Sequence, residues 1–139
     1  MDKYPSNSRS GLERKLDGLK RISKKVRYEK MMYIDFTAGD KAYKLRLSIR
    51  ATVALEKQLG VNPLMIFGNG DTIPTITVMV NVLHAALQQY HHGISVNDAY
   101  DIFEAWLNDG NSITDFLPII IEVYKVSGII KQDEETEKN

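Results

Sequence analysis

LEKQLGVNPLMIF, residues 55–67, holds the end of one helix and the start of another. Gly60 is the usual left-handed residue that follows a helix, Asn62 is a good N-cap, and Pro63 suits a first helical turn. A phosphate-binding loop would instead need several glycines and then Lys-Ser or Lys-Thr after a strand, which this corner lacks. The corner therefore predicts a bend between packed helices.

Upstream of this corner the sequence changes to a period of two. Apolar and polar residues alternate over 33–37 and again over 42–49, on either side of Gly39 and Asp40. This alternation is typical of a half-buried hairpin, and we expect strands near 32–37 and 42–47. Because an isolated hairpin is barely stable in water, its apolar face should lie on helices.

Around the corner, caps and apolar spacing predict a series of helices. They are expected over about 51–59, 62–67, 74–90, 95–109 and 112–127. Ser48 is the expected cap of the first. Pro118 should kink the last helix or delay its start. The fold class predicted is mainly α, with an N-terminal two-stranded β-hairpin followed by a bundle of about five helices.

The third of these helices is expected to be the central one. One of its faces carries a long apolar row: Ile76, Met79, Val80, Leu83, Leu87 and Tyr90. A second apolar set, Val78, Val82 and Ala85, lies to the side, which favours burial on two sides over a surface presented to a partner. In the next helix, Tyr100, Phe103 and Trp106 are expected in the core.

Composition indicates one domain, since 139 residues with 43% hydrophobic and 26% charged residues can bury a core. The net charge of zero divides into +6 over residues 1–30 and −6 over the rest. We expect a basic leader over 1–30, weakly helical or disordered, a helical domain with its hairpin over 31–130, and a disordered acidic tail over 131–139. We keep Met1, Met31 and Met32 as alternatives for the natural start of translation.

The residue types also limit the chemistry. Without cysteine there is no thiolate nucleophile and no sulfur-ligated zinc site. His84, His91 and His92 lack the spacing that would let them chelate one ion together, and Asp101 and Glu104 are expected to be ordinary solvated carboxylates. We predict no catalytic residues, no metal and no cofactor. No run approaches the roughly 18 apolar residues of a membrane helix, which favours a cytoplasmic protein without membrane contact.

The order of these features resembles that of the tail assembly chaperones of long-tailed bacteriophages and prophages of Gram-positive bacteria. The resemblance covers about residues 32–130 and rests on residues 43–48 (YKLRLS), residues 54–60 (ALEKQLG), the restart at Asn62-Pro63-Leu64, the long helix and the helix after Ser112.

This resemblance implies a non-virion chaperone, working in the host cytoplasm, that binds the tape-measure protein and helps recruit tail-tube subunits. We expect client contact at Val78 and Val82, by capture of an amphipathic segment. The hairpin edge could pair with a second copy of the chain. The alternative is a small nucleic-acid-binding or adaptor protein using the basic leader. It is disfavoured, because Tyr4 and Tyr28 are the only aromatic residues there.

Overall fold

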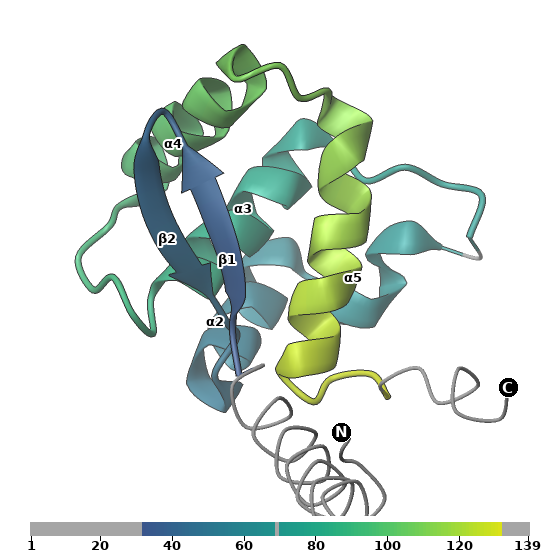
Figure 1. Cartoon of the computed structure of the whole chain (residues 1–139). Coiled ribbons are helices and arrows are strands. Elements are labelled where there is room, and N and C mark those ends of the chain that lie inside the picture. Colours follow the sequence, from purple (N-terminus) through teal and green to yellow (C-terminus); the bar gives the residue numbers. More distant parts are fainter. Residues whose placement is uncertain (1–31, 69, 132–139) are drawn as a thin grey trace, which may run out of the picture. The chain divides into compact units, whose positions relative to one another are not determined.

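A computed structural model describes residues 32–68 and 70–131. The basic leader predicted over 1–30 and most of the acidic tail predicted over 131–139 lie outside these residues. The described part holds a two-stranded antiparallel hairpin followed by four α-helices, with two short 3₁₀ helices between them (Figure 1). The mainly helical fold with a leading hairpin is therefore confirmed, whereas the predicted number of about five helices is corrected to four.

Strands β1 (Ile34–Ala38) and β2 (Lys41–Leu45) form the hairpin, with bounds one or two residues from those expected. Gly39 and Asp40 connect them with positive φ angles of 56° and 72°, the combination that a two-residue type I′ turn requires. The turn packs closely, because a Cβ on Gly39 would lie 3.2 Å from the Cβ of Ala105. The Gly39 N–H donates to Asp109 Oδ2 at 2.8 Å.

The corner at residues 55–67 bends as predicted. Helix α2 (Ile49–Leu59) begins after Ser48, whose Oγ accepts the Ala51 N–H, and ends at the left-handed Gly60. Asn62 caps the next segment through its Oδ1, which accepts the Leu64 N–H at 2.9 Å. That segment, η1 (Pro63–Phe67), is the expected short helix and is of the 3₁₀ type. Five residues before Gly68 leave little room for the i→i+4 bonds of an α-helix.

Helix α3 (Ile76–Leu87) lies at the centre of the fold and contacts α2, α4, α5 and β2. Met79, Val80, Leu83 and Leu87 are buried, and so are Val82 and Ala85, which confirms burial on two sides. Two residues of the expected core row differ. Ile76, the first residue of the helix, is exposed, and Tyr90 lies beyond the end of the helix, where its ring meets Tyr33 edge to face.

Helices α4 (Val96–Asn108) and α5 (Phe116–Val126) complete the core, with η2 (Ile113–Asp115) between them. Phe103 and Trp106 are buried as expected, but Tyr100 is exposed and is not part of the aromatic core. Pro118 is the third residue of α5, where its missing N–H would have had no helical partner. The α-helix therefore begins at Phe116, after η2, and not directly after Ser112.

The start of α4 is stabilised by a reciprocal cap. Ser95 Oγ accepts the Asp98 N–H and Asp98 Oδ2 accepts the Ser95 N–H, each at 3.0 Å. These hydrogen bonds lower the pKa of the Asp98 carboxyl. Replacing Ser95 with alanine should lower the free energy of unfolding by about 1 kcal/mol, measured by urea denaturation. An equal loss from Asn97→Ala, an exposed residue in the same turn, would contradict a capping role.

Candidate protein-binding surface

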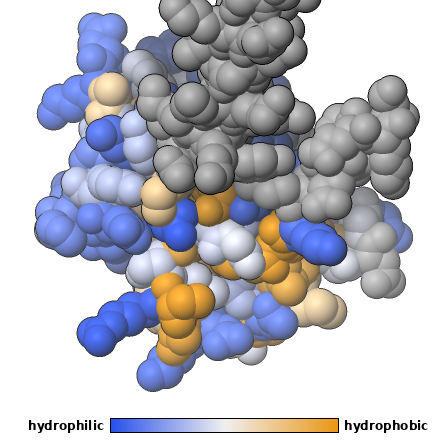
Figure 2. Space-filling model, turned by 60° about the horizontal axis from the view of Figure 1, so that its bottom comes forward, coloured by the Kyte–Doolittle hydropathy of each residue, from blue (hydrophilic) through white to orange (hydrophobic). Residues whose placement is uncertain are grey.

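Exposed apolar side chains gather in and around η1. Five of them come from residues 61–76 and are here called the η1 surface: Val61, Leu64, Met65, Ile73 and Ile76. Met65 and Ile73 are each 58% exposed, which is high for side chains of this size. In Figure 2 apolar surface is visible among polar side chains on the face turned toward the reader. Groups of exposed apolar residues of this kind mark protein-binding surfaces.

The geometry of the 3₁₀ helix explains which side chains of η1 face outward. With three residues per turn, side chains three positions apart lie in one row. Pro63 and Ile66 form the buried row, Leu64 and Phe67 form a row that is only partly covered, and Met65 stands alone on the outside. The apolar run Leu64 to Phe67 therefore cannot be buried completely, because its side chains point to different sides of η1.

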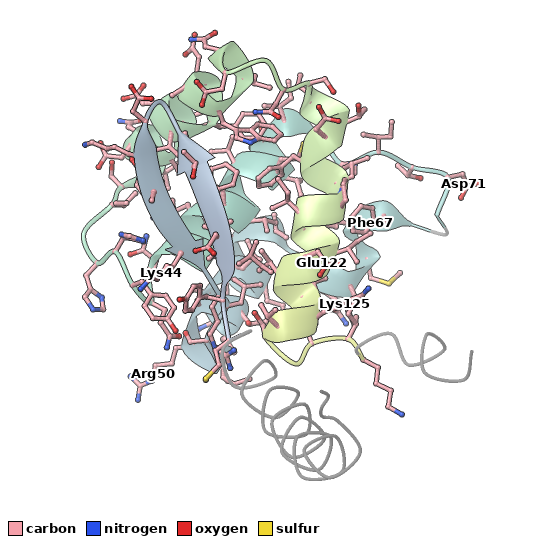
Figure 3. All side chains as sticks on the ribbon, viewed as in Figure 1. Lys44, Arg50, Phe67, Asp71, Glu122 and Lys125 are labelled. Atoms are coloured by element: carbon pink, nitrogen blue, oxygen red, sulfur yellow. The ribbon has the colours of Figure 1, made fainter. Side chains whose placement is uncertain are left out.

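Two contacts hold η1 against the helices. The Tyr124 hydroxyl of α5 donates to the Pro63 carbonyl at 2.9 Å, and this bond is buried. Burial raises the pKa of Tyr124, so the phenol remains a donor at neutral pH. Phe67 packs against the core, and Figure 3 shows its side chain near α5, which carries Glu122 and Lys125. The η1 surface is thus presented by an anchored element.

The loop after η1 folds back toward it. The Gly70 N–H donates to the Phe67 carbonyl at 2.9 Å. A Cβ on Gly68 would lie 2.9 Å from the Thr72 Oγ1, so Thr72 lies next to the end of η1. Pro74 is buried just beyond. These contacts place Gly70 and Thr72, which precede Ile73, next to the end of η1.

Charges of both signs lie on α2 and α5, two helices that contact η1. Glu56 and Lys57 of α2 line a shallow pocket of about 340 Å³ together with Gly60, Val61 and Asn62. On α5, Lys125 Nζ lies 3.6 Å from Glu122 Oε2. Protein interfaces commonly have an apolar centre and a polar rim, and this arrangement has the same character.

A second exposed apolar pair lies on α2. Ile49 is 75% exposed, and Val53, one helical turn later, is also exposed. The pair lies near the start of α2, whereas η1 follows its end. It offers a matched reference for substitutions in the η1 surface.

The two residues predicted to face a client are placed differently. Val82 is 1% exposed and belongs to the core, and Val78 is half-buried with its N–H donating to Thr75 Oγ1. Val82 has almost no surface for a client while the domain is folded. No residue of the η1 surface was predicted from the sequence to contact a client, although the run Leu64 to Phe67 was the available signal.

The histidines and carboxylates considered from the sequence as metal ligands or catalytic residues do not come together at one site. His84 is half-buried, His92 is exposed, and His91 accepts a backbone hydrogen bond from β2. Within residues 32–68 and 70–131, no three His, Cys, Asp or Glu side chains are placed to hold a metal ion. Asp101 lines a cleft of about 450 Å³ between the hairpin turn and α4, with Asp98 and Lys41, while Glu104 is exposed nearby on α4.

None of the helices in the described part of the chain is both long enough and apolar enough to span a membrane. A protein-family model described as a family of unknown function, DUF6096, matches residues 30–139. Neither the curated proteins nor the solved structures contain a match.

Proposed function

The chain belongs to the family DUF6096, whose function is unknown, and from its own residues we propose that it is a bacteriophage tail assembly chaperone. It binds the tape-measure protein, keeps that long chain soluble and helps recruit tail-tube subunits during tail assembly. It acts in the cytoplasm of the bacterial host, as a binding protein and not as an enzyme, and is absent from the finished virion.

The observation that carries the proposal is the η1 surface. A chaperone for helical segments needs exposed apolar side chains that can cover the apolar face of its client. Leu64 and Met65 offer such side chains on an element fixed by the Tyr124 hydrogen bond. Since η1 is already anchored, binding costs less conformational entropy than it would on a free loop.

The resemblance to this class of chaperones supports the proposal through the same elements. It rests on the segment ending in Ser48, on the helix that stops at Gly60, and on the restart at Asn62. Ser48 and Gly60 cap α2, which leads to η1, and Asn62 caps η1 itself. The η1 surface therefore lies within the part of the chain that carries the resemblance.

Co-expression with the tape-measure protein of the same phage or prophage tests the function. We expect the tape-measure protein to stay soluble and to co-purify with the full-length chain. The double variant Leu64→Asp/Met65→Asp should lower the affinity about 100-fold or more, because two apolar contacts are lost and two charges face the client. Co-purification and titration calorimetry with the isolated client segment would measure the loss.

The matched control is Ile49→Asp/Val53→Asp, which changes two exposed apolar residues of α2. This control should bind the client normally, and both double variants should keep the unfolding temperature within a few degrees. Equal loss of binding in the two double variants would contradict the assignment to the η1 surface. A client that aggregates with or without the chain would contradict the chaperone function itself.

The nucleic-acid alternative makes a different prediction. Binding through residues 1–30, with their charge of +6, would weaken steeply as salt rises and would disappear when those residues are removed. Capture of a client by apolar residues would persist at high salt. One salt titration with the full chain and the shortened chain therefore separates the two functions.

A further inference from the structure

The side chain of His91 closes part of the outer edge of the hairpin. His91 follows α3, and its N–H donates to the Leu87 carbonyl at 2.8 Å. Its Nε2 accepts the backbone N–H of Lys44 at 2.9 Å, and its ring meets Tyr43 edge to face with 5.2 Å between the ring centres. Figure 3 shows Lys44 on β2, the strand farther from α5 in this view.

The hairpin register explains why Lys44 needs this acceptor. Residues Ala38 and Lys41 flank the two-residue turn, so they pair through hydrogen bonds, and the pattern repeats at Tyr43 and Leu45. The N–H of Lys44 therefore points away from β1. Just past the end of β2, the Arg46 N–H donates to the Ala86 carbonyl at 2.9 Å. One side-chain acceptor and one backbone acceptor thus join this edge to the end of α3 and the turn after it.

The hydrogen bond from the Lys44 amide requires a neutral His91 ring. Because Lys44 donates to Nε2, that nitrogen must carry a lone pair, and the neutral ring holds its proton on Nδ1. An imidazolium has a proton on both nitrogens, so it cannot accept this bond. Protonation would also place a positive charge beside Lys44, whose ammonium lies 4.9 Å from the ring centre of Tyr33 and 5.7 Å from that of Tyr90.

The elements around this site carry groups of both signs. Those that face it or line the adjoining clefts are Lys41, Tyr43 and Lys44 on β2, Tyr33 and Asp35 at β1, Arg50 on α2, Tyr90 and His92 after α3, and Asp98 and Asp101 on α4. Asp35 lies opposite Lys44 in the hairpin, and Asp98 is engaged in the Ser95 cap. The hydrogen-bond partner of the His91 ring is the Lys44 amide and neither of these carboxylates.

From this geometry we propose that His91 is an acid-sensitive latch on the outer edge of β2. The neutral ring binds the Lys44 amide and joins the hairpin to the turn between α3 and α4. The protonated ring releases that amide and leaves the edge open to water or to another strand. This inference does not depend on the proposed chaperone function.

The direction of the pH effect follows from the environment. Burial, and then the charge of Lys44, lower the pKa of His91 below its ordinary value of 6.5. A histidine whose pKa is lower in the folded state favours folding in its deprotonated, neutral form. The stabilisation is therefore complete above about pH 6.5 and is lost as the pH falls through the pKa of the folded state.

NMR titration of the full-length chain from pH 8 to pH 4.5 tests the latch. The His91 ring and the Lys44 amide should titrate with one shared midpoint below pH 6.5. Hydrogen exchange at the Lys44 amide, corrected for its intrinsic pH dependence, should become at least about 10-fold faster below that midpoint. His92→Gln, a change in the exposed neighbour, should leave the midpoint unchanged, and His91→Phe should remove the Lys44 transition.

Two results would overturn the latch. One is a Lys44 amide that does not respond while the His91 ring titrates. The other is a neutral His91 with its proton on Nε2, which nitrogen chemical shifts identify directly. Both are read from the unmodified chain, so neither depends on whether a variant folds.

Discussion

Replacing Phe116 with alanine is expected to lower the free energy of unfolding by about 3–5 kcal/mol. Phe116 is 1% exposed and begins α5. Its ring meets three others edge to face, with ring centres 6.0 Å from Phe36, 5.2 Å from Phe103 and 5.6 Å from Trp106. These partners come from β1 and α4, so one side chain joins the hairpin to two helices. Alanine would leave a cavity at their junction.

Urea denaturation of the full-length chain, followed by tryptophan fluorescence, would measure this loss. The control is Ile121→Ala in the same helix, whose side chain is partly exposed and should cost about 1 kcal/mol or less. A loss below about 1 kcal/mol in the Phe116 variant would contradict its role as the centre of the aromatic core.

Replacing Val82 with aspartate is expected to unfold the domain. Val82 lies on the central helix α3 with 1% of its surface exposed, and no charged side chain in the described residues is buried with it. An unpaired carboxylate at such a position costs several kcal/mol, which is comparable to the whole stability of a small domain. Far-UV circular dichroism and a thermal scan would show the loss of the cooperative transition.

Val53→Asp is the matched control, since it makes the same change on the exposed face of α2. This variant should retain a cooperative transition. If Val82→Asp stays folded and loses only client binding, then Val82 does contact the client, as first expected from the sequence. Unfolding would assign Val82 to the core and leave the η1 surface as the place to test for binding.

Local signals were the most reliable guide to the fold. Ser48, Gly60, Asn62 and Ser95 each cap an element, because capping depends only on residues within one turn. The position of the segment after Pro63 was not predictable in the same way. Its buried hydrogen bond comes from the Tyr124 hydroxyl, which lies 61 positions away and binds the Pro63 carbonyl.

Apolar periodicity predicted which elements are helices but not which apolar residues remain exposed. The row on α3 that includes Ile76 and Tyr90 continues in the sequence past both ends of its buried segment. Burial depends on neighbours: Val82 has them on its side of α3, whereas Met65 in η1 does not. A surface made of exposed apolar residues therefore cannot be separated from a core by spacing alone.

The C-terminal end of α5 also determines when the domain can be completed during synthesis. Arg46 Nη1 donates to the Val126 carbonyl, and the buried Leu47 donates its amide to Ser127 Oγ, each across 80 positions. A ribosome makes the hairpin well before these acceptors, which lie 80 positions later. Until then, the chain leaving the ribosome has an unfinished core and exposed apolar residues. A protein proposed to protect others from aggregation thus passes through an aggregation-prone stage itself.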